Sequence, residues 1–251
     1  QGGKVVFTDR GLAGETVEVE VTKERRSYAE ARTTAILEPS PDRVEPRCAH
    51  YLACSPYQDM DYRVEVETKR TQVEEILTRA LKRPFGKLPI TPSPEVWGYR
   101  NKIALRVARE DGRAELVYHE RGQQASYVAV DTCFLVPDRV NDILARVREA
   151  VATAPLTTVE GLEVRTSRSS GESIVLCELG AESEIKAVAT ALKDLAGECR
   201  LVGAVASVYD GKHVRGERLF GRDFVEERAG GLTFRIGAWS FFQINTACLL
   251  Y

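Results

Sequence analysis

Residues 99–107 read YRNKIALRV, and this stretch decides the fold class. Its apolar residues recur at every second position and are Ile103, Leu105 and Val107. Lys102 and Arg106 fall between them, so the two kinds of side chain point to opposite faces of a strand. The stretch therefore predicts a half-buried strand whose exposed face is basic.

Strand patterns and helical patterns follow one another on both sides of this stretch. Residues 62–82 repeat apolar or small side chains at helical spacing and end at Pro84 and Gly86, which predicts an amphipathic helix. Two further helices are predicted at residues 140–151 and 182–195. Further strands are predicted at residues 116–118, 127–130, 162–166, 174–179, 201–208, 224–227 and 232–236. Because the two kinds of element do not alternate strictly, we predict an α+β fold rather than a doubly wound sheet.

The first 45 residues show a different pattern. Short apolar–polar alternations at residues 5–7, 17–21 and 29–37 are separated by turn-like and charged residues, which predicts a small antiparallel barrel. The proline-rich break at residues 39–47 then predicts a domain boundary.

The composition is that of a globular chain without a dominant charge. Of the 251 residues, 35 are basic and 37 acidic, so any contact with nucleic acid requires a local patch. No run approaches the roughly 20 apolar residues that cross a bilayer, and we predict a cytoplasmic protein without a membrane partner or an obligate protein partner. The chain begins with Gln1, and residues 246–251 look like a helix that stops before its cap, so we expect a fragment.

Two stretches carry side chains suited to binding. Arg100, Lys102 and Arg106 could contact successive phosphates along a strand, or they could form an ordinary solvated strand face. Residues 238–245, AWSFFQIN, combine three aromatic rings with Gln and Asn, which suits a planar heterocycle that is stacked on its face and hydrogen-bonded at its edge. The alternative for this second stretch is an aromatic core cluster that leads into a helix.

Cysteine usage indicates reduced thiols, because six cysteines in 251 residues are too sparse for a disulfide-stapled scaffold. Cys48 and Cys54 differ from the others because they bracket a short segment rich in turn and aromatic residues, where a metal or cluster could be held. Two thiolates alone do not make a site. The three histidines lack metal-ligand spacing and no glycine-rich phosphate loop occurs, which argues against a zinc enzyme or a nucleotide hydrolase.

Four signatures, taken in order, resemble the RNA uridine-5-methyltransferases, which use S-adenosylmethionine to make 5-methyluridine in tRNA and ribosomal RNA. The signatures are GGKVVF at residues 2–7 with the segments that follow it to Pro46, the cysteine segment with residues 62–77, WGYRNK at residues 97–102, and SFFQIN at residues 240–245. The resemblance covers nearly the whole chain. It implies an OB-like TRAM β-barrel that binds RNA at residues 1–45, a central α+β domain over residues 46–239, and the start of a Rossmann-like catalytic domain at residues 240–251. It also implies that the helix at residues 62–82 packs on that catalytic domain.

The family's chemistry compensates for the weak nucleophilicity of uracil C5. A cysteine thiolate adds to C6, the resulting enolate takes the methyl group at C5, and a carboxylate removes the C5 proton. Both groups follow the Phe-Phe-Gln motif in the family, so we expect them beyond Tyr251 and assign no catalytic residue here; Cys248 does not occupy the nucleophile's place. Gln243 matches the family glutamine that contacts S-adenosylmethionine, and Phe241 or Phe242 would line the cofactor pocket.

Many members of the family hold a [4Fe-4S] cluster on Cys-x5-Cys-Gly-Gly-Cys and a fourth cysteine. Cys48 and Cys54 match the first pair and Cys133 the fourth position, but residues 55–58 read SPYQ, so the third thiolate is absent. A cluster here would need another ligand, and without a cluster the loop would pack as an ordinary turn.

We therefore predict a truncated RNA 5-methyluridine methyltransferase that is inactive by itself and has ribosomal RNA or tRNA as its partner. Basic residues of the predicted barrel are further candidates for RNA contact, and they are Lys4, Arg10, Lys23, Arg25 and Arg26. The alternatives are a non-catalytic RNA-binding module and an iron–sulfur redox protein.

Overall fold

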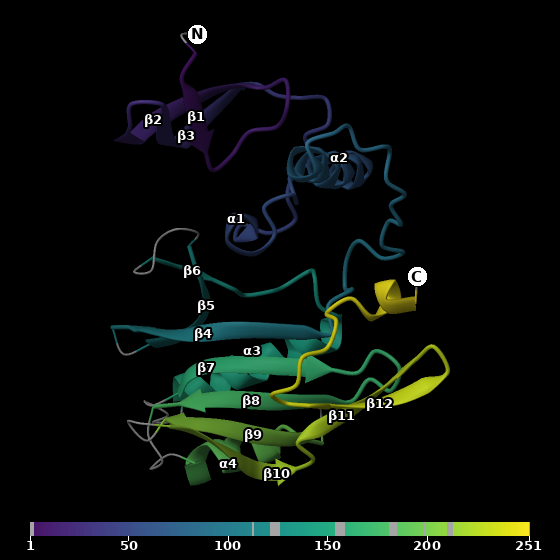
Figure 1. The fold of residues 1–251 in the computed structure, drawn as a ribbon. Coiled ribbons are helices and arrows are strands. Elements are labelled where there is room, and N and C mark those ends of the chain that lie inside the picture. The colour runs from purple at the N-terminus through teal and green to yellow at the C-terminus, as the bar shows by residue number, and fades with distance from the viewer. Residues whose placement is uncertain are drawn as a thin grey trace. The chain divides into compact units, whose positions relative to one another are not determined.

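The computed structural model describes residues 3–111, 113–120, 126–153, 159–180, 185–197, 199–209 and 213–250. Gly2, Tyr251 and the first three residues of the helix predicted at 182–195 lie outside the described residues. The chain forms two compact units, residues 1–92 and residues 93–251, and each is described by itself (Figure 1).

The N-terminal unit begins with a three-stranded sheet. Its strands are β1 (Val5–Thr8), β2 (Thr16–Glu24) and β3 (Tyr28–Glu38), in the order β1-β3-β2. The three predicted strands are confirmed, but the antiparallel barrel predicted for residues 1–45 is not, because β1 runs parallel to β3 and the described strands form an open sheet. The strand residues that are buried are only Ala29, Ala31 and Thr33, which is too little enclosed side-chain volume for a barrel interior.

An ion-paired cluster joins this sheet to the cysteine segment. The side chain of Glu15 has no exposed surface, and Arg43 Nε donates to its Oε1 at 2.5 Å while Arg43 Nη1 donates to Asp59 Oδ2 at 2.7 Å. The hydrogen bond from Arg43 lowers the pKa of Glu15 to about 2 even though burial opposes the charge. Arg43 thus links carboxylates on both sides of residues 39–47. The two compact units divide after residue 92, and the domain boundary expected near residues 39–47 stays a prediction.

The helix predicted at residues 62–82 is confirmed. α2 (Tyr62–Leu81) follows the one-turn helix α1 (Tyr51–Cys54), begins where the Asp61 side chain accepts a hydrogen bond from Arg63 N, and ends at Lys82 in the left-handed conformation. None of its residues is buried, and Ile76 is 58% exposed. The helix is therefore partly exposed, with Val73 and Leu81 exposed beside Ile76 and with Val66 and Leu77 half-buried.

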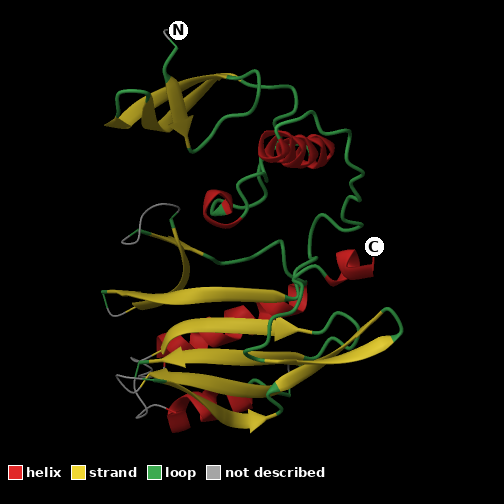
Figure 2. Ribbon diagram, in the orientation of Figure 1, coloured by secondary structure: helices red, strands yellow, loops and turns green. Residues whose placement is uncertain are grey.

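The second unit is built on a seven-stranded sheet with the order β10-β9-β8-β7-β4-β5-β6. Its strands are β4 (Lys102–Glu110), β5 (Arg113–His119), β6 (Tyr127–Ala129), β7 (Val159–Thr166), β8 (Ser173–Leu179), β9 (Leu201–Tyr209) and β10 (Val214–Gly221). Helices α3 (Asp138–Thr153) and α4 (Ile185–Asp194) cover one face (Figure 2). The hairpin of β11 (Phe224–Ala229) and β12 (Leu232–Gly237) packs on part of the other face, which we call the front face.

The alternation in residues 99–107 explains the two sides of this sheet. Ile103 and Leu105 point toward α3 and α4 and are each 3% exposed, so they belong to the main core. Lys102 and Arg106 point to the front face. The predicted α+β class is confirmed for this unit, and only β10 among the described strands was not predicted. None of the described helices combines the length and apolar character that crossing a bilayer requires.

Candidate functional site

The SFFQIN segment, residues 240–245, leaves β12 and crosses the front face of the sheet (Figure 1). Ala238 anchors its start in the small core beneath the hairpin and is 4% exposed. Ser240 N donates to Gly237 O at 3.0 Å, which makes a tight turn. Arg165 Nη2, from a side chain on β7 that is only 4% exposed, then donates to Ser240 O at 2.8 Å. The sheet therefore holds the first residue of the segment by its backbone.

Asn101 fixes the second half of the segment. Its backbone N donates to Ile244 O at 2.9 Å, and its side-chain Nδ2 donates both to Gln243 O at 2.8 Å and to Thr246 Oγ1 at 3.0 Å. Asn101 is 3% exposed, so these bonds form away from water. One buried amide thus holds the main chain of the predicted cofactor-binding glutamine.

Asn245 fastens the end of the segment. It forms a bridge with Arg100, and its Nδ2 donates to Ser93 Oγ at 2.8 Å. Its Oδ1 accepts from Cys248 N at 3.3 Å, so it caps the 3-10 helix η2 (Thr246–Leu250). The helical start predicted from Thr246 is therefore present as a short 3-10 helix among the described residues.

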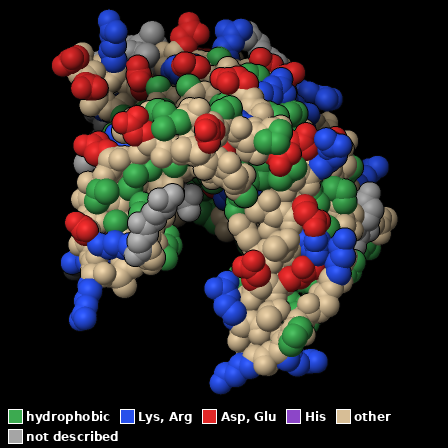
Figure 3. Space-filling model, turned by 90° about the horizontal axis from the view of Figure 1, so that it is seen from above, with side chains coloured by type: hydrophobic (Ala, Val, Ile, Leu, Met, Phe, Trp, Pro, Cys, Tyr) green, Lys and Arg blue, Asp and Glu red, His purple; other side chains and the backbone are tan. Residues whose placement is uncertain are grey.

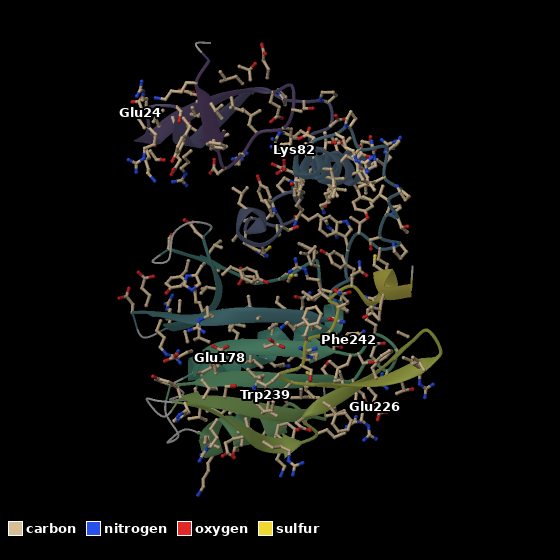
Figure 4. All side chains as sticks on the ribbon, in the orientation of Figure 1. Glu24, Lys82, Glu178, Glu226, Trp239 and Phe242 are labelled. Atoms are coloured by element: carbon tan, nitrogen blue, oxygen red, sulfur yellow. The ribbon has the colours of Figure 1, made fainter. Side chains whose placement is uncertain are left out.

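Most side chains of the segment are exposed, and Phe242 and Asn245 are half-buried. Phe242 is half-buried and packs against Phe234 with ring centroids 5.7 Å apart (Figure 4). Phe241 is 85% exposed, and Gln243 is exposed as well. Phe242 thus joins a core cluster, while Phe241 and Gln243 are exposed, so the role of these two residues in binding a ligand stays a prediction. An exposed ring and an exposed amide on a fixed backbone are groups that can stack on a planar heterocycle and hydrogen-bond to its edge.

The predicted basic face is present but its cations are paired. Lys102 Nζ lies 2.9 Å from Glu163 Oε2, and Arg106 forms a hydrogen-bonded ion pair with Glu178. Arg100 precedes β4, is half-buried and lies 6.0 Å from the centre of the Tyr99 ring. Lys and Arg side chains are likewise interspersed with Asp and Glu on the surface shown in Figure 3. Carboxylates on neighbouring strands thus reduce the net positive charge expected from the strand alone.

The cysteine segment packs as a turn. Cys48 Sγ lies 3.4 Å from Gln58 Nε2, which donates to it, and Cys54 Sγ donates to His50 O at 3.7 Å. Cys133 is 1% exposed and belongs to the other unit. No group of three or more His, Cys, Asp or Glu residues suited to a metal ion occurs in the part of the chain that is described. Within residues 1–92, Cys48 and Cys54 supply two of the four thiolates that a [4Fe-4S] cluster takes, and there the segment packs as an ordinary turn.

Asn101 and Arg165 are the site residues that sequence reasoning missed. Asn101 has the same parity as Ile103 and Leu105, so it falls on the buried face of the strand. A polar residue on a buried face needs hydrogen-bond partners, and this is the signal that could have singled it out. Nothing in the local sequence around Arg165 indicates its contact with residue 240.

Comparison with known proteins shows what the whole chain is similar to. No family model matches the chain. Over 97% of its length the chain is 29% identical to an uncharacterized RNA methyltransferase of Caldanaerobacter subterraneus and 26% identical to one of Thermosynechococcus vestitus. Over 60% of its length it is 35% identical to a 23S rRNA (uracil(1939)-C(5))-methyltransferase of Bordetella avium, of which it covers 32%. The chain is similar to RNA methyltransferases.

The fold is also similar to that of a solved RNA methyltransferase. The crystal structure of Pyrococcus abyssi tRNA (uracil-54, C5)-methyltransferase in complex with S-adenosyl-L-homocysteine matches 97% of this chain with a TM-score of 0.68 at 19% identity. The chain covers 57% of that structure and 58% of the length of the first two relatives. It therefore corresponds to somewhat more than half of these methyltransferases.

Proposed function

We propose that this chain is the RNA-binding and cofactor-contacting part of an S-adenosylmethionine-dependent RNA uracil-C5 methyltransferase, with ribosomal RNA or tRNA as its substrate. The observation that carries the proposal is the SFFQIN segment, whose main chain is held by the buried Asn101 while Phe241 and Gln243 face solvent. The similarity to proteins named as RNA methyltransferases over 97% of the chain supports it.

S-adenosylmethionine, when bound, supplies the methyl group for C5 of the uridine. Phe241 offers a ring for stacking, Gln243 offers an amide for hydrogen bonding, and Phe242 supports both from the core. The proposal places the nucleophilic cysteine and the general base outside these 251 residues, as the resemblance to the RNA uridine-5-methyltransferases implies. Lys102 and Arg106 contact RNA phosphates by exchanging their present carboxylate partners, and Arg100 lies beside them.

The test uses the natural protein that contains this chain. Transfer of tritiated methyl groups from S-adenosylmethionine to ribosomal RNA and to tRNA is measured, and digested RNA is analysed for 5-methyluridine. We expect Gln243→Ala to lower methyl transfer at subsaturating cofactor by about 10- to 100-fold, because a hydrogen bond to a charged ligand contributes roughly 1.5–3 kcal/mol. Gln72→Ala, on an exposed amide of α2, serves as the matched control and should leave the rate unchanged.

Two results would contradict the proposal. The absence of 5-methyluridine from both RNAs would exclude the activity. A protein that binds RNA without methylating it would instead favour a non-catalytic RNA-binding module. Residues 1–251 alone are expected to bind RNA and to transfer no methyl group.

A further inference from the structure

Trp239 is held in place although it is largely exposed (Figure 4). Trp239 is 53% exposed, and its indole Nε1 donates a hydrogen bond to Ser207 Oγ at 2.9 Å. A Cβ added at Gly216 would come within 2.8 Å of Cζ2 and 2.9 Å of Cη2 of the indole. The ring therefore occupies space over β10 that only glycine leaves open, and it cannot turn without losing its hydrogen bond.

The indole lies over one end of a row of residues that crosses five strands of the front face. The row runs through Arg106, Gly161, Glu178, Ser207 and Gly216, each paired in register with the next. A Cβ at Gly161 would lie 2.8 Å from Glu178 Oε2 and 3.3 Å from Arg106 Nη1, so the ion pair lies over one glycine as the indole lies over the other. Each of the two glycines in the row thus leaves room for side chains that lie flat against the sheet.

Exposed aromatic, apolar and basic side chains occur on the strands beneath the indole and two residues after it in the sequence. Tyr209 and Val214 form the next pair along β9 and β10 on the same face and are 55% and 69% exposed. Phe241 follows Trp239 by two residues and is 85% exposed. Arg218 is opposite Val205 on this face and is exposed. Helices α3 and α4 cover the opposite face of the sheet, so they do not cover this surface (Figure 2).

We propose that Trp239 is a stacking platform for an unpaired base of the RNA, an inference that rests on the proposed function. The indole N–H is already used within the protein, so the ring offers its π-surface, on which any base can stack. Arg218 supplies a cation for the phosphate backbone beside the stacked base. Single-stranded RNA is recognised in this way, by splayed bases on aromatic rings next to basic side chains.

The experiment uses the chain itself and single-stranded oligouridylate as the probe. Tryptophan fluorescence is followed during titration in a Trp97→Phe background, so that the emission is that of Trp239, and affinity is measured at several salt concentrations. We expect RNA to quench the emission, and Trp239→Ala to abolish that quenching and weaken binding about 5- to 100-fold, because stacking contributes roughly 1–3 kcal/mol per base. The slope of log affinity against log salt should stay unchanged, since no phosphate contact is removed. Trp239→Phe should retain most of the affinity because it keeps an aromatic face.

Two further variants separate stacking from a general effect on folding. Gly216→Ala keeps the indole but places a methyl group where the ring now lies, so it should weaken RNA binding as Trp239→Ala does. Tyr127→Ala removes an aromatic side chain of similar exposure, 47%, on β6 and should leave affinity unchanged.

The outcomes distinguish this inference from the proposed function. A chain that binds RNA equally well with and without Trp239 overturns the platform and leaves the methyltransferase proposal intact. A chain that binds no RNA overturns both. Trp239 emission that acrylamide does not quench in the free protein would show that another protein surface covers the ring, and this also overturns the platform.

Discussion

Replacing Asn101 tests whether one buried amide holds the SFFQIN segment. Asn101→Ala removes the two hydrogen bonds that Nδ2 donates, at 2.8 Å to Gln243 O and at 3.0 Å to Thr246 Oγ1. Each bond contributes about 1 kcal/mol net, so local opening of the segment should become easier by about 2 kcal/mol. This corresponds to exchange of the segment's amide hydrogens about 30-fold faster.

Asn101→Asp sharpens the same test because it keeps the shape of the side chain. It replaces the donating Nδ2 with a carboxylate oxygen that faces the Gln243 carbonyl oxygen in a site that is 3% exposed. Two acceptors then face one another without a proton between them, so the cost at neutral pH should exceed that of the alanine variant.

Hydrogen–deuterium exchange on peptides that span residues 238–249 measures the effect. The matched control is Asn141→Ala, because the Asn141 amide holds the Cys133 backbone by two hydrogen bonds of 2.9 and 3.1 Å in the same unit. The control should speed exchange around Cys133 and leave residues 238–249 protected. If Asn101→Ala speeds exchange in that segment no more than the control does, Asn101 does not position it.

Three other predictions follow from the ion pairs and the thiols. The folded-state pKa of Glu15 lies near 2 and its ordinary value is 4.5, so its stabilising contribution should be complete above pH 4.5 and be lost as the pH falls toward 2. Urea unfolding at several pH values should show this loss of stability. The variant Glu15→Gln should make the stability depend less on pH. Replacing Lys102 and Arg106 together by Ala should weaken RNA binding and reduce the slope of log affinity against log salt by less than about 1.4, because carboxylates compete with phosphates for both cations. An unchanged slope would show that these two residues do not contact RNA phosphates. Protein prepared anaerobically with iron and sulfide should stay colourless, and Cys48→Ser with Cys54→Ser should not change its thermal stability; a brown preparation would contradict the turn.

The helices and strands that could be predicted from the sequence are those whose own residues show a regular apolar–polar period. Residues 99–107 alternate strictly, and β4 has the buried and exposed faces that this alternation requires. β10 was missed because VRGERLFG has no clean period and contains two glycines. Glycine is needed at position 216 because a larger residue there would clash with the ring of Trp239, which is outside the strand. A residue whose identity is set by a contact 23 positions away leaves no local signal.

Strand pairing and charge pairing were also beyond local reasoning. The alternations at residues 5–7 and 29–37 predict strands, but nothing in them says that β1 pairs in parallel with β3. Similarly, Arg106 and Glu178 are 72 positions apart, so the basic face predicted from one strand could not include its carboxylates. Periodicity gives the orientation of a side chain, whereas its electrostatic environment depends on strands that the tertiary fold brings beside it.

The two proposed binding surfaces share one stretch of main chain, and this limits how the RNA can lie. Trp239 and Gln243 are four residues apart, so their Cα atoms are at most about 14 Å apart even in a fully extended chain. Arg165 holds the backbone between them at Ser240, and Asn101 holds it at Gln243. The Cα atom of the residue that carries a stacked base is therefore within about 14 Å of that of Gln243, the glutamine that we propose contacts the cofactor. Because the target base must leave its stack to be methylated, a platform at this distance would bind a nucleotide near the target uridine and hold the strand open beside it.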